Sequence, residues 1–237
     1  MRKILDFFTG WIQQVDLVLL ALCTGTTLFG CLMIASATRY TGSYKNVIVQ
    51  IAALGLGIVA YILMSMLDLN EIGKHWKWLL GGSLVLILLL KTPLGMDGGT
   101  GNRAWLGLKN FPVNLQPVEI VKITFIIVLA RQLQYLQEQR DLKSIPSVGM
   151  LAGHLVLVVG LYAAISGDMG SALVLIFIFA CMCFVAGVAL WWFIIGGGAA
   201  ALLFYAMWDL NLLDSYMKKR FIVLFDHSYD PLNTGWQ

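Results

Sequence analysis

MGSALVLIFIFACMCFVAGVALWWFIIGGGAAALLFYAMW, residues 169–208, is a run of forty residues without a single Asp, Glu, Lys or Arg. One helix crosses the hydrocarbon core of a bilayer with about 20 apolar residues. Because the run is twice that length, it predicts two membrane-spanning helices, at residues 169–188 and 190–208, joined by a turn near residues 187–191. This stretch therefore indicates that the chain folds in lipid rather than in water.

Five further apolar stretches precede this run and extend the same pattern toward the N-terminus. By the length rule they predict spans at residues 17–35, 47–66 and 76–94, a fourth that begins at Pro117, and a fifth at residues 145–165. The sequence thus predicts an all-α, polytopic transmembrane protein of about seven spans. We expect residues 1–237 to form a single membrane domain.

The overall composition supports this fold class and excludes several functions. Charged residues make up 12% of the chain, against about 25% in soluble domains. The net charge of +3 is too small to indicate nucleic acid, so the expected contacts of the basic residues are membrane lipids and phosphates. The four cysteines lie in apolar stretches without a CxxC spacing, and the three histidines lack the spacing of metal ligands. His154 stands alone on an apolar helix, where a hydrogen-bonded core residue is the usual interpretation.

Three hydrophilic segments are long enough to form functional loops: residues 93–116, 131–144 and 209–237. An odd number of crossings separates the first from the second, so the first and third are expected on one face of the membrane and the second on the other. Lys and Arg are shared almost equally between the two faces, so the positive-inside rule does not orient the chain. The first and third loops share their face with every candidate group described below.

Ionisable groups at membrane depth are candidates for function because they are costly to bury. Glu119 and Lys122 follow Pro117 in the first turns of the fourth span, and their i,i+3 spacing places them on one helix face, within reach of each other. A private ion pair that locks this helix against its neighbours is an equally good interpretation.

Asp168 lies where the fifth span ends and the sixth begins. Without other information, a helix N-cap is the favoured interpretation of an Asp at this position. The same face carries Arg103 and the basic run Lys218, Lys219 and Arg220, which would suit an anionic group such as a diphosphate. An ordinary headgroup anchor is the alternative for the basic run.

Several motifs, in order along the chain, resemble the SEDS family of shape, elongation, division and sporulation proteins. GNRAWL at residues 101–106, Phe111 and QPVEIVK at residues 116–122 resemble that family's signature loop and fourth helix. GDMGSAL at residues 167–173 resembles its PDxGTAL segment, and residues 220–237 resemble the start of its large outer loop. This chain departs from the pattern with Gly167 for proline, Val118 for serine and Trp236 for tyrosine.

The resemblance implies a peptidoglycan glycosyltransferase that polymerises lipid II at the outer face of the bacterial cytoplasmic membrane, with a class B penicillin-binding protein as partner. It places the N-terminus in the cytoplasm, which makes residues 131–144 a cytoplasmic loop and puts residues 93–116 and 209–237 outside. It also implies an outward-facing polar cavity lined by Glu119, Lys122 and Asp168, to which we add Arg103 and Trp105 as candidates. No cofactor is evident, no metal site is expected, and a requirement for a divalent cation is left open.

The resemblance also sets a limit on the catalytic assignment. Family members usually have ten spans, and the aspartate assigned as catalytic lies in the outer loop between the seventh and eighth. The sequence ends at Gln237, in the first part of that loop, and neither Asp226 nor Asp230 matches that aspartate. We therefore interpret the chain as an N-terminal part of such an enzyme, inactive alone, and favour the RodA branch because no long hydrophilic N-terminal extension is present.

Two other functional classes fit the same residues. In a flippase for lipid-linked precursors, or another transporter, the intramembrane ionisable groups would line a transport path. No second copy of the QPxExxK pattern appears, whereas transporters often contain inverted repeats. In the third hypothesis the protein is a non-catalytic scaffold of the cell-wall machinery.

Overall fold

The structure is a computed structural model that describes residues 15–41, 44–97, 102–107, 114–211, 218 and 222–223. It divides into two compact units, Met1–Lys74 and His75–Gln237, each described here by itself. The single membrane domain expected from the sequence stays a prediction.

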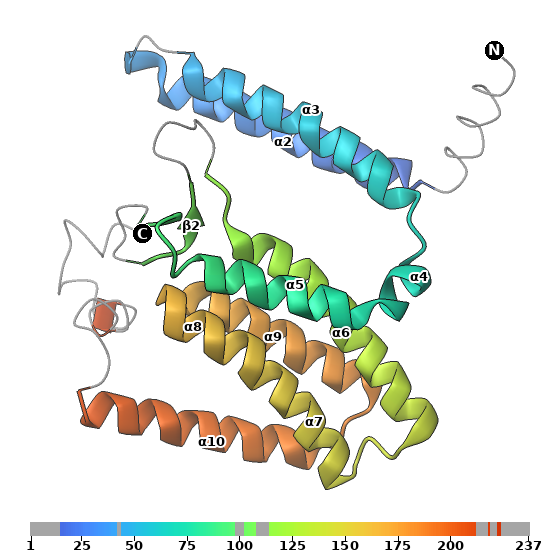
Figure 1. The fold of residues 1–237 in the computed structure, drawn as a ribbon. Coiled ribbons are helices and arrows are strands. Elements are labelled where there is room, and N and C mark those ends of the chain that lie inside the picture. The colour runs from blue at the N-terminus through green and yellow to red at the C-terminus, as the bar shows by residue number, and fades with distance from the viewer. Residues whose placement is uncertain are drawn as a thin grey trace, which may run out of the picture. The chain divides into compact units, whose positions relative to one another are not determined.

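The first unit is a helical hairpin followed by one short helix. It contains α2 (Leu17–Ala37), a 3-10 turn (Arg39–Thr41), α3 (Lys45–Ser65) and α4 (Leu69–Lys74), with α2 and α3 side by side (Figure 1). Asp16 caps α2, because its Oδ1 accepts the Leu19 N–H at 2.9 Å. The Tyr61 hydroxyl of α3 donates to the Asp16 carbonyl at 3.0 Å and joins the two helices at this end of the hairpin.

The second unit contains the remaining helices, three of which pack against a long central one. In chain order its elements are α5 (Trp76–Leu89), β1 (Gly95–Met96), β2 (Trp105–Leu106), α6 (Pro117–Gln139), α7 (Ile145–Leu155), a π-helical segment (Val156–Gly160), α8 (Leu161–Ser166), α9 (Met169–Ala186) and α10 (Leu190–Asp209).

Helix α6 is central because it packs against α5, α7 and α9. It buries apolar residues at three- and four-residue spacing, so they form one stripe along the helix: Val118, Val121, Phe125, Val128, Leu129, Leu133 and Leu136. The Ser83 and Thr124 hydroxyls add a polar contact of 2.6 Å between α5 and α6. Close packing of apolar side chains and hydroxyl pairs is how helices associate in lipid.

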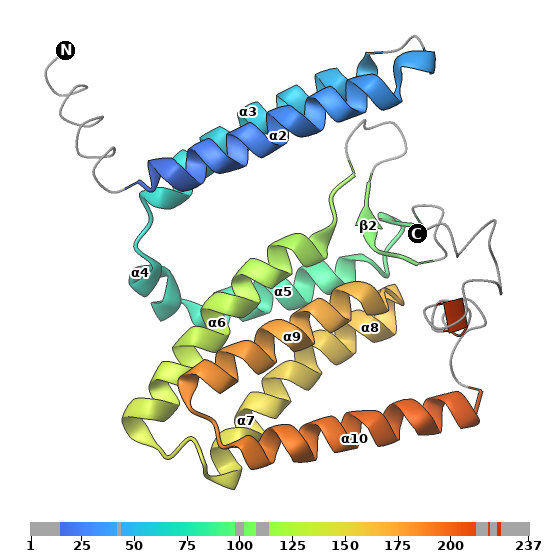
Figure 2. The ribbon, with the colours of Figure 1, turned by 180° about the vertical axis from the view of Figure 1, so that it is seen from behind.

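The helices of this unit run roughly antiparallel, so their ends fall into two groups. Figures 1 and 2 show that the end of α5, the start of α6 and the turn between α8 and α9 lie at one end of the unit. The start of α5, the end of α6 and the start of α7 lie at the opposite end. We call these the Asp168 end and the Trp76 end.

The helices occupy the places that the sequence predicts for membrane spans. Among the described residues, five are long and apolar enough to cross a bilayer, namely Leu17–Ala37, Lys45–Ser65, Ile145–Ser166, Met169–Ala186 and Leu190–Asp209. Helix α5 is apolar but shorter, with 14 residues, and the 23-residue α6 carries the charged residues discussed below. Large side chains such as Phe177 and Leu202 are exposed on these helices, as lipid-facing residues are. The predicted helical membrane fold is confirmed.

The two-stranded antiparallel sheet of the second unit is not predicted from the sequence. It lies in the loop between α5 and α6, where Gly95 pairs with Leu106 and Met96 with Trp105, and an isolated bridge joins Leu106 to Leu115. A Cβ atom at Gly95 would lie 1.9 Å from the Leu90 carbonyl oxygen, so only glycine allows this approach. The loop is thus anchored close to the end of α5.

Candidate functional site

Glu119 and Lys122 form an ion pair in the first turns of α6. The Lys122 Nζ lies 2.9 Å from Glu119 Oε1 and 2.8 Å from Oε2, so the ammonium group is shared by both carboxylate oxygens. Pro117 begins the helix, and Glu119 in its first turn interacts favourably with the helix dipole. The Glu119 side chain is 58% exposed and that of Lys122 is 24% exposed. The carboxylate of the pair is therefore accessible, and the pair is not buried in the core.

Asp168 is the N-cap of α9, as the favoured interpretation of the sequence predicted. Its Oδ1 accepts the Ser171 N–H at 3.3 Å, and its Oδ2 accepts the Ser171 hydroxyl at 2.6 Å and the Tyr162 hydroxyl at 3.1 Å. The backbone N–H of Asp168 donates to Ser166 Oγ at 2.9 Å. Because Tyr162 is fully buried, its hydroxyl holds the carboxylate from the protein interior.

The loop that contains the GNRAWL motif lies against the turn that carries Asp168. Gly167 has a φ of +71°, and the position of a Cβ atom there would be 3.3 Å from Asn102 Oδ1. Arg103, the residue after Asn102, is exposed, and Trp105 is half-buried in β2. Two segments more than sixty positions apart in the sequence therefore meet at the Asp168 end.

The structure brings the candidate residues to one end of the unit without joining them into one network. Among the described residues, no hydrogen bond or ion pair links Glu119 or Lys122 to Asp168. A common cavity lined by Glu119, Lys122, Asp168, Arg103 and Trp105 stays a prediction.

The basic run is described only at Lys218. Its ammonium donates to the Trp208 carbonyl at 3.2 Å, contacts Asn211 Oδ1 and lies 5.4 Å from the centre of the Trp208 ring. In this arrangement the Lys218 side chain caps the C-terminal end of α10. Lys219 and Arg220, together with Asp226 and Asp230, lie outside the described residues.

Sequence reasoning missed Tyr162, Ser171 and Asn102 as neighbours of the candidate site. Ser171 had a local signal, since the third residue after an N-cap often hydrogen-bonds back to it. Tyr162 and Asn102 had none, because their contacts depend on how the chain folds around Gly167.

Metal-binding clusters of three or more His, Cys, Asp or Glu side chains are absent from the residues that the structure describes. His154 is a hydrogen-bonded core residue, as predicted: it is 7% exposed, and its Nδ1 lies 3.0 Å from Gln132 Oε1. It lines a cavity at the Trp76 end, away from Asp168, which is described further below.

The family model described as "Cell cycle protein", FTSW_RODA_SPOVE, matches residues 14–237. The chain belongs to the FtsW/RodA/SpoVE family. With the apolar helices described above, membership in this family makes the protein an integral membrane protein. The resemblance inferred from the sequence motifs is confirmed.

Relatives of this family member include proteins of both named branches. It is 30% identical to a probable peptidoglycan glycosyltransferase FtsW of Geobacter metallireducens, over 95% of this chain and 60% of that protein. It is 28% identical to the peptidoglycan glycosyltransferase RodA of Treponema pallidum, over 76% of this chain and 40% of that protein. The RodA branch therefore stays a prediction.

Solved structures show the same fold. A chain of a peptidoglycan synthase complex that coordinates polymerization and crosslinking matches with a TM-score of 0.73 and 29% identity, over 91% of this chain and 60% of that one. RodA of Thermus thermophilus matches with a TM-score of 0.63 and 28% identity, over 78% of this chain and 57% of the other. The chain thus spans about three fifths of the length of these relatives.

Proposed function

We propose that this protein acts in peptidoglycan glycosyl transfer, polymerising lipid II at the outer face of the bacterial cytoplasmic membrane. The observation that carries the proposal is the family match over residues 14–237, together with relatives named peptidoglycan glycosyltransferases. An N-terminus in the cytoplasm would place the Asp168 end of the second unit outside, where lipid II polymerises. A class B penicillin-binding protein is the proposed partner, in keeping with the similarity to a chain of a peptidoglycan synthase complex.

The reaction joins a sugar hydroxyl of one lipid-linked disaccharide to the anomeric carbon of another and expels a lipid diphosphate. A carboxylate must accept the hydroxyl proton, and cations must stabilise the leaving diphosphate. No residue of this chain matches the aspartate that the family resemblance gives as catalytic, so we propose supporting roles for the residues of the candidate site. Lys122 and the exposed Arg103 are the proposed diphosphate contacts.

The hydrogen bonds of Asp168 assign it a different part from that of Glu119. Its carboxylate accepts three hydrogen bonds, from Tyr162 and twice from Ser171, so we assign it to holding the turn. Glu119 instead sets the position of the Lys122 ammonium, because both of its oxygens contact the Nζ atom.

The test is glycan polymer formed from lipid II by the protein expressed from its complete reading frame, with and without its penicillin-binding protein. Glu119→Gln is expected to reduce polymer by at least about tenfold, since one misplaced charge-assisted contact is worth a tenfold change or more. Glu71→Gln is the matched control, because Glu71 and Lys74 form an exposed i,i+3 ion pair in the other unit. Its polymer yield should equal that of the wild type.

Three results would contradict the proposal. Polymer undiminished in both Glu119→Gln and Lys122→Met would remove these residues from the site. Movement of dye-labelled lipid II across the membrane without any polymer would favour the transporter hypothesis, and neither activity, with the partner still bound, would favour the scaffold.

A further inference from the structure

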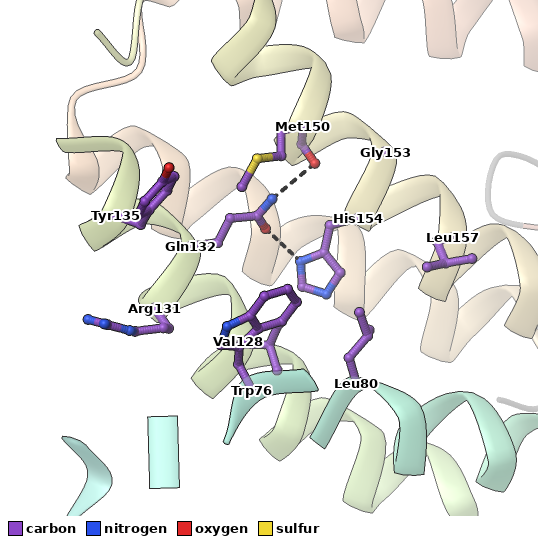
Figure 3. A pocket seen from close by; sticks show the side chains of 10 residues that line it. All are labelled: Trp76, Leu80, Val128, Arg131, Gln132, Tyr135, Met150, Gly153, His154 and Leu157. Atoms are coloured by element: carbon purple, nitrogen blue, oxygen red, sulfur yellow. Dashed lines mark hydrogen bonds between the residues drawn. The ribbon is translucent and has the colours of Figure 1, made fainter. Parts of the chain in front are cut away.

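A cavity of about 550 Å³ lies between α5, α6 and α7 at the Trp76 end of the second unit (Figure 3). Cavities of about 300–1,000 Å³ are typical of sites for small molecules. None of the groups proposed above for glycosyl transfer lines it, so its function is a separate question.

The lining residues fall into three layers along the bilayer normal. Arg131, Gln132 and His154 share one level, because Gln132 bonds to His154 and Arg131 precedes Gln132 on α6. One helical turn toward the middle of the unit the lining is apolar, with Val128 and Leu157.

One turn toward the Trp76 end the lining consists of Tyr135 and Met150, while Trp76 and Leu80, one turn apart on α5, line the cavity from the α5 side. Trp and Tyr are the side chains that gather where hydrocarbon meets water, so this layer marks the interface. From the middle of the unit outward the lining is therefore first apolar and then polar, which is the order that an amphiphile presents from its chain to its headgroup.

His154 contributes an unpaired acceptor to the polar layer. Gln132 Nε2 donates to the Met150 carbonyl at 3.0 Å, so Gln132 Oε1 is the atom that faces His154 Nδ1, and the ring proton must lie on Nδ1. In the neutral ring the lone pair is then on Nε2, which is buried and has no partner among the described residues. A buried polar atom without a partner is unfavourable in lipid, so a hydrogen-bond donor such as a hydroxyl completes it.

Arg131 contributes a positive charge that no carboxylate neutralises in the part of the chain that the structure describes. Its only described hydrogen bond is to the neutral amide of Gln134, whose Oε1 accepts from the guanidinium at 3.0 Å. The side chain is exposed, and Figure 3 shows it extending away from His154 at the edge of the cavity. A guanidinium in this position favours a phosphate group.

We propose that this cavity binds one anionic phospholipid with a hydroxylated headgroup, taken from the leaflet at the Trp76 end. Its acyl chain occupies the apolar layer, its phosphate lies on Arg131, and a headgroup hydroxyl donates to His154 Nε2. The apolar layer selects a lipid over a soluble phosphate ester, because only a lipid brings a chain to cover it.

The test is native mass spectrometry of the purified chain in detergent, titrated with phosphatidylglycerol, phosphatidylcholine or phosphatidic acid. One phosphatidylglycerol should be retained about tenfold better than phosphatidylcholine, the ratio expected for a charge-assisted hydrogen bond. Phosphatidic acid, which has the phosphate without the alcohol, should fall between them. Glycerol 3-phosphate, which has the headgroup chemistry without the chains, should not compete.

Variants locate the binding in the cavity. Gly153 lines it, and a Cβ there meets nothing within 4 Å, so Gly153→Phe should fill the space and abolish the selective retention. Gly82→Phe is the matched control, at a glycine that is also open but does not line the cavity. Arg131→Gln should reduce the preference over phosphatidylcholine to the part that the headgroup hydroxyl contributes, whereas Arg140→Gln should leave it unchanged. His154→Leu should remove the preference over phosphatidic acid.

Several outcomes would overturn the proposal. Equal retention of phosphatidylglycerol and phosphatidylcholine, or retention unchanged by Gly153→Phe, would mean that the lipids only coat the protein. Competition by glycerol 3-phosphate would assign the site to a soluble ester. If Gly153→Phe loses helical content, Leu157→Trp replaces it, because Leu157 lines the same apolar layer from an exposed position. Leu157→Trp should likewise abolish the selective retention.

Discussion

Asp168 confirms one of the two interpretations that the sequence states as alternatives, the helix N-cap. It caps α9 through Ser171, and it lies at the end of the unit where Asn102 meets Gly167. Its carboxylate is held from the protein interior by Tyr162 and from α9 by Ser171. Substitutions of Asp168 that preserve the cap and substitutions that remove it are therefore expected to differ in their effect on stability.

The first prediction concerns this cap. Asp168→Ala removes an acceptor of three hydrogen bonds and is expected to lower the free energy of unfolding by about 1–2 kcal/mol, whereas Asp168→Asn should retain most of it because Asn caps helices as well as Asp. Unfolding in a denaturing detergent titration, followed by circular dichroism, measures both. Asp16→Ala removes the corresponding cap of α2 and is the control for the loss of a helix cap at a position away from the candidate site. Equal stability of Asp168→Ala and the wild type would show that the cap is not formed.

The second prediction concerns Gly167, whose φ of +71° is left-handed. Gly167→Ala is expected to lower the free energy of unfolding by about 1–2 kcal/mol, since L-residues are strained there. Gly167→Pro should lower it more, because proline fixes φ near −65°. The proline of the family pattern is thus the wrong residue for this backbone.

The same unfolding titration tests Gly167 against Gly149. Gly149→Ala, at an open helical position, should be neutral or stabilising by up to about 1 kcal/mol. A Gly167→Pro protein as stable as the wild type would show that the turn is not left-handed in the membrane.

At the level of whole helices, the sequence predicted what depends on local length and polarity. Residues 169–188 and 190–208 were predicted as helices with a turn between, and the structure has Met169–Ala186 and Leu190–Asp209 with Gly187 at a φ of +90°. A long run without charged residues can lie in lipid, and there the backbone must satisfy its own hydrogen bonds, which a helix does. Such a run therefore predicts a helical span.

The elements that the sequence did not predict depend on distant partners. Strands of two residues have no recognisable periodicity, and the pairing of Gly95 with Leu106 spans a loop. The π-helical segment Val156–Gly160 contains no proline, and Pro146 lies at the start of α7, so no sequence signal marks the interruption. The cavity beside His154 depends on Gln132, which is 22 positions away. In the candidate site, Glu119 and Lys122 could be paired from i,i+3 spacing, whereas Tyr162 could not be assigned to Asp168.

The third prediction concerns the association of α5 with α6. Ser83 and Thr124 contact each other at 2.6 Å, and the hydroxyl that donates across the contact also has a carbonyl of its own helix within reach, so the loss of either partner is partly compensated. A double-mutant cycle with Ser83→Ala and Thr124→Val should give a coupling of about 0.6 kcal/mol, the average for such bonds between membrane helices. Coupling is measured from unfolding in detergent mixtures. Ser147→Ala with Thr124→Val, which pairs residues without a described contact, should give none.

For the molecule as a whole, the helices of the second unit alternate in direction, and the functional proposals depend on that alternation. The Glu119–Lys122 pair and the Asp168 turn lie at one end, and the lipid cavity lies at the other. If α6, α7 with α8, α9 and α10 each cross the bilayer, Asn102 and Asn211 face one side and Ser144 the other. The proposed orientation makes the Asn102 side external.

The last prediction tests this sidedness with single cysteines. The four native cysteines are free thiols, so they can be replaced by alanine without breaking a disulfide. Asn102→Cys and Asn211→Cys should then react with a membrane-impermeant maleimide in intact spheroplasts, and Ser144→Cys only after permeabilisation. The side on which Asn102 lies also depends on whether α5 crosses the bilayer. The 14 residues of α5 span about 21 Å at 1.5 Å per residue, which is less than the roughly 30 Å of the hydrocarbon core, so the labelling of Asn102→Cys tests this crossing as well. Labelling of Asn102→Cys and Ser144→Cys from the same side would mean that α6 does not cross. Labelling of all three from the opposite sides would keep the fold but place the Asp168 end in the cytoplasm, where polymerisation of lipid II at the outer face could not use it.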